Sequence, residues 1–362
     1  MTDAWCMEQA LALAVLGEGT TAPNPRVGCL LVRDGEVVGR GWHRAAGLPH
    51  AEAMALAEAG PRAAGATLYV NLEPCAHQGR TPPCVSALVA AGVRRVVAAV
   101  GDPDPRVNGR GFEQLRRAGV EVEVGLLADQ AERVNAGFLR RHRSGRPHVT
   151  LKAALSLDGM LAGLAGRSHW ITGESARRFA HRLRLKHDAV VVGAETVRRD
   201  DPRLTARLPG AARQPLPVVL APELRLPASG ALFAGEARPR VYVGEGLVPG
   251  PEWEGKADLV PLPAPEGRLD PAAVLADLCR EGVQSVLVEG GGRTFASFLT
   301  AGLVDEVALF VAPLLLGARG ATPLLDMAAA AEPALGHRVA ELRRLALDED
   351  VLLLGRLACS PA

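Results

Sequence analysis

The chain has 362 residues, of which 48% are apolar, so it is long enough for two domains with packed cores. Its 41 lysines and arginines nearly balance its 40 aspartates and glutamates, which argues against a protein that coats nucleic acid. Its six scattered cysteines do not resemble a disulfide framework, no apolar run reaches membrane-spanning length, and its acidic N-terminal stretch lacks the basic region of a secretory signal, so we expect a soluble cytoplasmic protein.

The first half of the chain predicts alternating helices and strands. A helix is expected over Asp3–Gly17, and the hairpin turn Asp34-Gly35 joins two short strands, Val27–Val32 and Glu36–Gly41. Asn24, which lies between two prolines before the first strand, is either a turn residue or a ligand contact at a strand end.

Three residues with the ligand chemistry of zinc follow. His50 begins an expected helix, Cys75 comes directly after an expected strand that ends at Glu73-Pro74, and Cys84 opens a second helix. A catalytic zinc takes three protein ligands and leaves one position for water, whose pKa it lowers to about 7. Glu52, two residues past the histidine, can carry protons from that water to a leaving group. His-x-Glu followed by Pro-Cys and a later Cys is typical of zinc-dependent base deaminases.

A structural zinc site is the alternative, and it would need a fourth protein ligand. Cys29 and His77 are the nearby candidates, although Cys29 lies inside an apolar strand and is better explained as a core residue. Arg80, in the loop between the two ligand cysteines, could bind a substrate phosphate or be a solvated charge. The catalytic interpretation is favoured because it also gives Glu52 a role.

The second half of the chain predicts another α/β domain. An expected helix over 129–145 ends in a basic stretch, so we place a boundary near Gly145 and predict domains 1–145 and 146–362. Beyond it we expect a strand from His148, a basic helix over Glu174–Leu185, a buried strand over Asp188–Gly193 and a polar loop over 194–207.

A glycine-rich turn is the second chemical feature. Gly290–Gly292 lies between an expected strand, Ser285–Glu289, and an expected helix, Thr294–Ala301. Such a turn presents backbone N–H groups to an anion such as a phosphate. A tight packing turn explains it about as well, and the full dinucleotide-binding fingerprint is absent.

Both halves resemble one family, the bifunctional riboflavin biosynthesis deaminase/reductases. The resemblance rests in the first half on Pro23–Gly28, His50–Glu52, Glu73–Cys84 and Asp102–Gly111, and in the second half on Leu151–Gly159, Ser168–Gly173, Asp200–Arg207 and Val288–Gly292. Eight residues separate the two ligand cysteines, whereas tRNA adenosine and cytidine deaminases usually have two there. The second half is similar in fold to dihydrofolate reductase.

The resemblance implies an N-terminal cytidine-deaminase-like three-layer α/β/α domain and a C-terminal dihydrofolate-reductase-like α/β domain. It implies zinc-dependent deamination of 2,5-diamino-6-(5-phosphoribosylamino)pyrimidin-4-one, followed by NADPH-dependent reduction of the ribosyl side chain of the resulting aminouracil to ribityl. The implied partners are these phosphoribosylated pyrimidines and further copies of the chain, with neither nucleic acid nor membrane.

The resemblance also assigns residue roles. His50, Cys75 and Cys84 hold zinc, and Glu52 moves protons. The first substrate would contact Asn24, His43, His77 and Arg80. The cofactor would contact Ala154, Trp170, Thr196, Asp200, Gly291, Gly292, Arg293 and Thr294. The second substrate would contact Lys152, Ser168, Arg184, Leu204, Arg207 and Glu289.

The chain departs from the family pattern at a few positions. Met160 and Leu161 stand where a basic residue and a Thr-like residue are usual, a hydroxyl residue is missing near Ala165, and Asp104 replaces an Asn. Two other hypotheses stay open on the sequence alone: a nucleic-acid base deaminase, and a structural zinc module joined to a nucleotide-binding scaffold.

Overall fold

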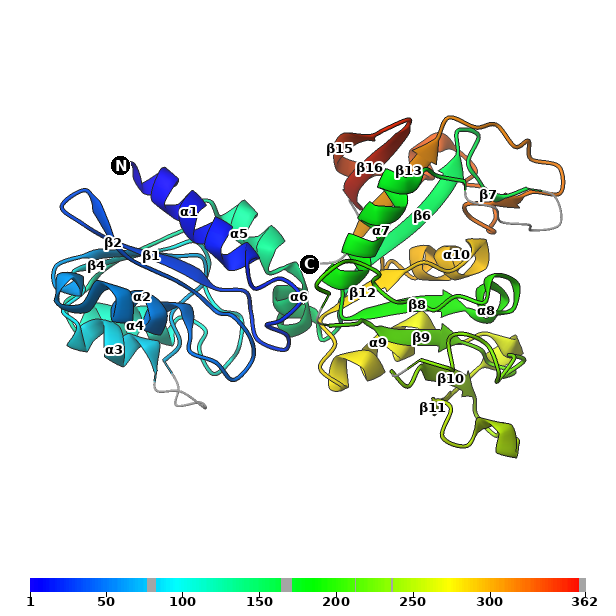
Figure 1. The fold of residues 1–362 in the computed structure, drawn as a ribbon, viewed down its shortest axis with the longest axis horizontal. Helices are drawn as coiled ribbons and strands as arrows, with labels where there is room; N and C mark the ends of the chain where they lie inside the picture. Colours follow the sequence, from blue (N-terminus) through cyan, green and yellow to red (C-terminus); the bar gives the residue numbers. More distant parts are fainter. Residues whose placement is uncertain (77–82, 164–170, 212, 236, 358–362) are drawn as a thin grey trace. The chain divides into compact units, whose positions relative to one another are not determined.

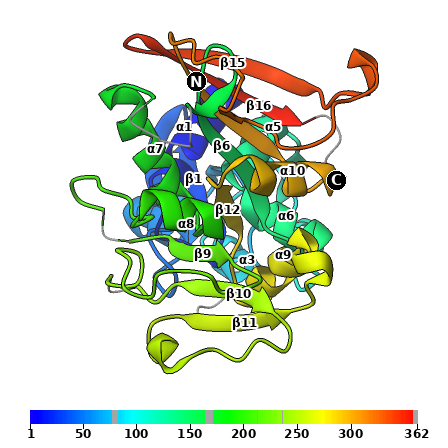
Figure 2. The ribbon, with the colours of Figure 1, turned by 90° about the vertical axis from the view of Figure 1, so that its right-hand side faces the viewer.

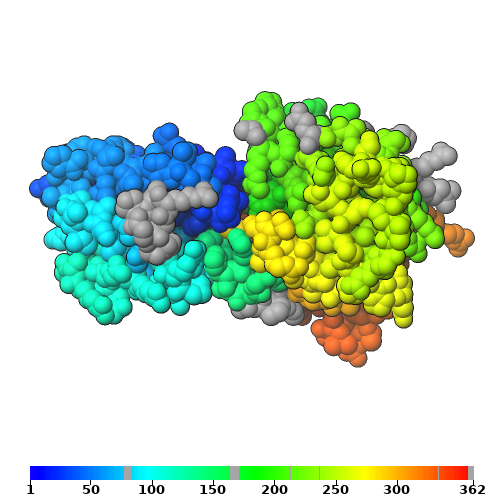
Figure 3. All heavy atoms as spheres, turned by 90° about the horizontal axis from the view of Figure 1, so that it is seen from below, coloured from blue at the N-terminus to red at the C-terminus, as the bar shows by residue number. Residues whose placement is uncertain are grey.

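The computed structural model describes residues 1–76, 83–163, 171–211, 213–235 and 237–357. The chain divides between Gly145 and Arg146 into two compact units, each built from one continuous stretch of sequence, as the colours in Figures 1 and 3 show. Within the described ranges, every helix is too short or too polar to cross a membrane.

The first unit is organised around a five-stranded sheet in the order β2-β1-β3-β4-β5. Strands β1 and β2 form the predicted hairpin, β1 also pairs antiparallel with β3, and β3, β4 and β5 run parallel. The strands are β1 (Gly28–Arg33), β2 (Glu36–Trp42), β3 (Thr67–Val70), β4 (Arg95–Ala98) and β5 (Glu121–Val124).

Helices cover both faces of this sheet (Figure 1). Alternate strand residues point to opposite faces, so Leu31 packs with α2, α3 and α4, whereas its neighbour Leu30 packs with α1, α5 and α6. The result is a three-layer α/β/α unit. Its helices are α1 (Asp3–Val15), α2 (Ala51–Ala59), α3 (Cys84–Ala90), α4 (Arg110–Arg117), α5 (Ala128–Val134) and α6 (Ala136–Ser144), with a 3-10 turn, η1, at Gly60–Ala63.

Two glycines bring α2 unusually close to strand β2. A Cβ atom at Gly39 would lie 2.2 Å from the carbonyl oxygen of Ala55, and one at Gly41 would lie 1.9 Å from that of Ala51. Only glycine allows this approach. The N-terminus of α2, which carries His50 and Glu52, is therefore held directly against the sheet.

The single helix expected over 129–145 is wrong: it is broken at Asn135 into α5 and α6. The Asn135 side chain accepts a hydrogen bond from the Arg26 N–H at 2.8 Å and donates one to the Arg26 carbonyl at 2.9 Å. Asn71 donates to the same carbonyl and accepts from the Gly28 N–H. The loop that contains Asn24 is thus tied to β3 and to the last helices of the unit.

The second unit contains a nine-stranded sheet in the order β11-β10-β9-β8-β12-β6-β13-β16-β15, which Figure 2 shows from one edge to the other. All neighbours pair parallel except β13 with β16 and β16 with β15. The strands are β6 (His148–Ser156), β8 (Ala189–Gly193), β9 (Leu216–Leu220), β10 (Arg240–Gly244), β11 (Asp258–Leu262), β12 (Ser285–Val288), β13 (Glu306–Ala312), β15 (Val339–Leu347) and β16 (Asp350–Leu357), with a separate pair β7 (Met160–Ala162) and β14 (Thr322–Pro323).

Helices again cover both faces of the sheet, α7 and α8 on one and α9 and α10 on the other (Figure 2). In β8, Val190 and Val192 pack toward α7 and α8, while Ala189 and Val191 pack toward α9 and α10. The helices are α7 (Glu174–Lys186), α8 (Ala194–Asp200), α9 (Pro271–Arg280) and α10 (Gly292–Thr300), with 3-10 turns η3 (Pro251–Trp253), η4 (Pro265–Gly267) and η5 (Pro333–Leu335).

The expectation of a polar loop over 194–207 is wrong for its first half, which forms α8. Val197 is buried in the core, and Glu195 forms ion pairs with Arg198 and Arg199 one turn further along the helix. One buried apolar residue and ion pairs at helical spacing stabilise this short helix. Its many charged residues are the reason that a polar loop was predicted.

Candidate functional site

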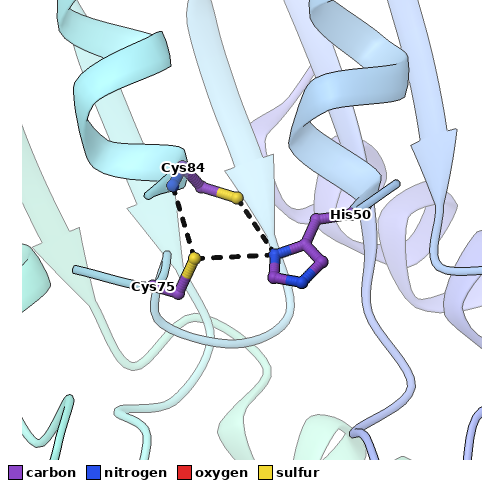
Figure 4. A group of neighbouring side chains, drawn as sticks. All are labelled: His50, Cys75 and Cys84. Atoms are coloured by element: carbon purple, nitrogen blue, oxygen red, sulfur yellow. Dashed lines mark hydrogen bonds between the residues drawn. The ribbon is translucent and has the colours of Figure 1, made fainter. Parts of the chain in front are cut away.

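The three predicted zinc ligands are brought together at the ends of secondary-structure elements (Figure 4). His50 is the N-cap of α2, Cys84 is the first residue of α3, and Cys75 lies in the segment that follows β3. Strands β2 and β3 both pair antiparallel with β1, so they run in the same direction and their carboxyl ends lie at the same edge of the sheet, where α2 and α3 begin. Residues separated by up to 34 positions meet there.

The geometry of the three ligand atoms fits zinc. His50 Nδ1 lies 3.3 Å from Cys84 Sγ and 3.5 Å from Cys75 Sγ. Zinc bonded tetrahedrally to nitrogen at about 2.0 Å and to sulfur at about 2.3 Å would separate these atoms by about 3.5 Å. The donor set of one imidazole and two sulfurs is also the chemistry that zinc prefers.

The surroundings of the ligands favour a thiolate. Hydrogen bonds from the Cys84 thiol, His50 and the Cys84 backbone hold the pKa of Cys75 well below its ordinary value. The Cys84 N–H, at the N-terminus of α3, lies 3.3 Å from that sulfur. The same contact with Cys75 raises the pKa of Cys84, so a bound metal would have to displace the second proton.

Glu52 lies beside the two cysteines on the first turn of α2. Its side chain is buried, with 3% of the residue exposed, and burial followed by the nearby charge of Cys75 raises the pKa of its carboxyl group. A hydrogen bond links it to the Cys84 thiol. A buried carboxyl group with a raised pKa next to a metal site is well suited to accept and release protons.

Asn24 and His43 form one wall next to the ligands. Asn24 Nδ2 lies 3.0 Å from His43 Nε2, His43 Nδ1 lies 3.2 Å from the Pro49 carbonyl oxygen, and the rings of His43 and His50 meet edge to face at 5.5 Å. Burial lowers the pKa of His43, which favours a neutral ring that donates to Pro49 and accepts from Asn24. The wall is therefore polar but uncharged.

The alternative of a structural zinc finds no fourth ligand among the described residues. Cys29 is fully buried in β1 and does not belong to the group, which consists of His50, Cys75 and Cys84. His77 and Arg80, predicted to contact the substrate, lie outside the described ranges.

A second cluster gathers three of the predicted residues in the second unit. Arg184 on α7 donates two hydrogen bonds to the Glu289 carboxylate, at 2.7 and 2.8 Å, and Lys152 on β6 lies 3.7 Å from the same carboxylate. All three side chains are largely buried. Burial alone would raise the pKa of Glu289, but Arg184 and Lys152 outweigh it and lower the value to about 2. Burial lowers the pKa of Lys152.

The segment with Leu204 and Arg207 is anchored next to this cluster. Arg184 Nη1 donates to the Thr205 carbonyl at 3.0 Å, and the Arg207 N–H donates to His181 Nδ1 at 3.3 Å. The Leu204 side chain is buried in the core, so only its main chain is available to a ligand. His181 was not predicted, although it lies one helical turn before Arg184 on the same face of α7; burial and the two arginines lower its pKa to about 4.

The glycine turn is explained at least in part by packing. A Cβ atom at Gly290 would lie 2.8 Å from the Gly193 nitrogen, and one at Gly292 would lie 2.8 Å from the Pro323 carbonyl oxygen. Gly291 has no such close neighbour, and its N–H donates to Thr196 Oγ1 at 3.3 Å. The turn thus joins the ends of β12 and β8, beside the N-termini of α10 and α8.

The remaining predicted cofactor residues occupy the same edge of the sheet or fall outside the described ranges. Thr294 Oγ1 approaches Gly193, Ala154 lies in β6, Asp200 ends α8, and the exposed Arg293 pairs with Asp326 at 3.3 Å. Strands β8, β12 and β6 are adjacent, and ligands of open α/β sheets bind at the carboxyl ends of such strands. Ser168 and Trp170 lie outside the described ranges.

Two family models match the chain, one for each unit. The cytidine and deoxycytidylate deaminase zinc-binding region matches residues 1–100, and the RibD C-terminal domain matches residues 147–353. The first match contains His50, Cys75 and Cys84, so the predicted zinc region is confirmed. The predicted two-domain α/β fold is also confirmed.

Full-length relatives agree with these matches. The riboflavin biosynthesis protein RibD of Escherichia coli is 41% identical over 98% of this chain and all of its own length, and that of Aquifex aeolicus is 43% identical over 86% of this chain and 87% of its own. The structure of Acinetobacter baumannii RibD is 38% identical with a TM-score of 0.90, and a deaminase/reductase structure from Thermotoga maritima is 32% identical with a TM-score of 0.87. Each pair covers 98% of this chain and 99% of the other.

Proposed function

The chain belongs to the RibD family of riboflavin biosynthesis deaminase/reductases, and we propose that its two units carry out successive steps on one pyrimidine. Residues 1–145 deaminate 2,5-diamino-6-(5-phosphoribosylamino)pyrimidin-4-one. Residues 146–362 then reduce the ribosyl side chain of 5-amino-6-(5-phosphoribosylamino)uracil to ribityl with NADPH. The observation that carries the proposal is the zinc-ligand group with the buried Glu52 beside it, in a chain whose other unit matches the reductase model.

The deamination requires water to replace an amino group on a ring carbon. Zinc held by His50, Cys75 and Cys84 supplies an activated water when it is bound. Glu52 takes a proton from that water and gives it to the departing amine, which leaves as ammonia. Burial raises the pKa of the Glu52 carboxyl group, which favours its taking up the proton of the water before passing it on.

Recognition of the first substrate falls to the polar wall and to the loop between the cysteines. Asn24 and His43 offer hydrogen-bonding groups to the pyrimidine ring without placing a second charge near the metal. Arg80, and His77 beside it in the sequence, are assigned to the substrate by the family resemblance, which gives the guanidinium a phosphate partner.

The reduction requires a bound sugar phosphate and a nicotinamide that supplies hydride. Arg184 and Arg207 bring positive charge to the second site for a phosphate, and the Leu204 main chain belongs to the same segment as Arg207. The family resemblance adds Ser168 to this substrate set. Lys152, oriented by Glu289, faces the ribosyl group and polarises it. Gly291, Gly292, Arg293 and Thr294, together with Ala154, Trp170, Thr196 and Asp200, hold the cofactor, whose reactive ring supplies the hydride.

A two-step assay tests the proposal on the full chain. Protein with bound zinc is given the diaminopyrimidine substrate, ammonia is measured first, and the loss of NADPH absorbance is followed second. We expect ammonia release without NADPH, and NADPH consumption only after deamination or with the pre-formed aminouracil. Absence of ammonia from zinc-loaded protein would exclude the deaminase assignment, and equal use of the undeaminated substrate by the reductase would exclude the order of steps.

We further propose a cytoplasmic homo-oligomer. Two thiolates that must stay reduced to hold zinc support a reducing compartment. Strand β15 forms one edge of the nine-stranded sheet and exposes Val339, Leu342 and Leu345, and a second copy of the chain would cover such an apolar edge. Light scattering should give a multiple of the 37.9 kDa chain mass, reduced toward the monomer by Leu342→Lys; a monomeric wild type would contradict it.

A further inference from the structure

The Glu73 carboxylate, two residues before the ligand Cys75 in the sequence, accepts hydrogen bonds from several backbone N–H groups. Only 3% of the residue is exposed. Its Oε2 accepts from the N–H groups of Asp102 at 3.1 Å and Gly109 at 3.0 Å, and its Oε1 accepts from Gly111 at 2.9 Å and Phe112 at 3.4 Å. Four N–H groups fill the hydrogen-bonding capacity of an ionised carboxylate.

Three of these donors belong to the N-terminus of helix α4. Its N-cap, Gly109, offers no side chain to satisfy the first N–H groups, so Glu73 performs the capping from 36 residues earlier in the chain. The negative carboxylate also meets the positive end of the helix dipole. Glu73 therefore fixes α4 against the segment that follows β3.

The contact between α4 and this segment is too tight for any side chain. A Cβ atom at Gly111 would lie 2.3 Å from the Pro74 carbonyl oxygen and 3.0 Å from Glu73 Oε1. The proline ring fixes the φ of Pro74 itself and restricts the backbone of the preceding residue, Glu73. The peptide that leads into Cys75 is thus held by α4 on one side and begins at a residue whose φ is fixed.

Cys75 itself is held on its other side by α3. The Val85 N–H donates to the Cys75 carbonyl at 3.3 Å, and the Cys84 N–H lies 3.3 Å from the Cys75 sulfur. Two helix N-termini therefore fix this ligand, α3 directly and α4 through Glu73. Of the three ligands, Cys75 alone lies outside a helix or its cap, so it depends most on such support.

We propose that Glu73 is a positioning residue for zinc, which fixes the direction of the Cys75 sulfur and so sets the affinity and ligand geometry of the metal site. It does not contact the reacting atoms. Loss of a supporting residue typically weakens metal binding by about 10- to 100-fold. The inference rests on Cys75 as a zinc ligand and is independent of which pyrimidine is deaminated.

The test is zinc affinity of full-length Glu73→Gln, measured by competition with a chromophoric chelator. Glutamine keeps the shape but turns an NH₂ group toward N–H donors. We expect zinc binding to weaken by about 10- to 100-fold, and the thiolate-to-metal absorption of the cobalt-substituted protein to shift. Folded Glu73→Gln with wild-type affinity and an unchanged cobalt spectrum would overturn the proposal.

Asp188→Asn is the matched control, because this buried carboxylate also accepts backbone N–H groups, from Gln284 at 2.9 Å and Ser285 at 3.0 Å, but in the second unit. Its zinc affinity should equal that of the wild type. Equal weakening in both variants would show general destabilisation and contradict a positioning role.

A second variant keeps the test decisive if Glu73→Gln does not fold. Gly109 has a φ of 82° and open space around its Cβ position, so Gly109→Ala strains only the backbone that donates to Glu73. Its zinc affinity should fall less than that of Glu73→Gln, and wild-type affinity would overturn the proposal. Cys75→Ser tests whether Cys75 is a zinc ligand, separately from whether Glu73 positions it. Wild-type zinc affinity in Cys75→Ser would show that Cys75 does not bind zinc.

Discussion

The two sites of this chain are built in opposite ways. The zinc ligands come from residues 50 to 84, at the ends of neighbouring elements, and an ion would hold them together. The charged cluster of the second unit comes from Lys152, Arg184 and Glu289, on two strand regions and a helix far apart in sequence, and it is held together by ion pairs of two positive side chains with one carboxylate. A short sequence motif can supply metal ligands in many folds, whereas the second cluster exists only once the large sheet has formed.

Removal of zinc should produce the largest difference between the activities of the two sites. Dialysis against a chelator under reducing conditions should abolish ammonia release, because the ion supplies the activated water. NADPH oxidation with pre-formed aminouracil should remain at its starting rate. Restored ammonia release on adding zinc back is the control, and chelation that stops both activities would show that the sites are not independent.

Glu52→Gln should reduce the deaminase activity almost as strongly, without affecting the reductase activity, while the metal stays bound. Removing a general acid–base group slows the chemical step by about 10²- to 10⁴-fold. Zinc content, measured by metal analysis, and reductase activity should be those of the wild type. Wild-type ammonia release by this variant would exclude Glu52 as the proton carrier.

Glu289→Gln should break the second site through stability as well as activity. The change leaves Arg184 and Lys152 buried without their counter-ion, and removal of one partner from a buried pair costs about 3–5 kcal/mol. Faster hydrogen exchange in peptides from α7 and β12, with lost reductase activity and unchanged zinc affinity, is the expected result. Unchanged exchange would mean that water already screens the cluster.

Acid should lower the stability of the second unit through two buried groups. Burial keeps His187 neutral, and the positive charges of Arg184 and Lys152 keep Glu289 ionised. Burial lowers the pKa of His187 to about 3, so the stability that its neutral form contributes is present above about 6.5 and is lost as pH falls toward 3. The lowered pKa of Glu289 adds a loss between its ordinary 4.5 and about 2. Urea unfolding at successive pH values should show less acid sensitivity in His187→Gln; identical pH profiles would contradict it.

The smallest predicted effect concerns the glycine turn. Thr196→Val removes the hydroxyl that accepts the Gly291 N–H, a contact of about 1 kcal/mol, and should raise the KM for NADPH about fivefold. The deaminase should be unaffected. A change in kcat with KM unaltered would argue against a role of this turn in cofactor binding.

The difference between the sites also explains what could be predicted from sequence. His50, Cys75 and Cys84 could be placed together because each begins or follows an element that its local pattern predicts. The hairpin of β1 and β2 could be predicted from the Asp34-Gly35 turn. The Lys152, Arg184 and Glu289 cluster was identified through family resemblance, since no local pattern links residues on separate strands.

Other features depend on contacts that no local pattern carries. The charged segment of α8 is stabilised by burial of Val197 in a core built from strands that are distant in the sequence. The break at Asn135 depends on Arg26, and the backbone role of Glu73 depends on a helix whose N-cap lies 36 residues later. Strands β15 and β16, which complete the sheet by antiparallel pairing, were not predicted.

The bond between Asn135 and Arg26 has a consequence for how the first unit is made. Asn71 can tie the loop that carries Asn24 soon after β3 has been synthesised, but the second tie needs Asn135, near the end of the first unit. The polar wall that Asn24 forms with His43 is therefore completed only when nearly all of this unit has left the ribosome.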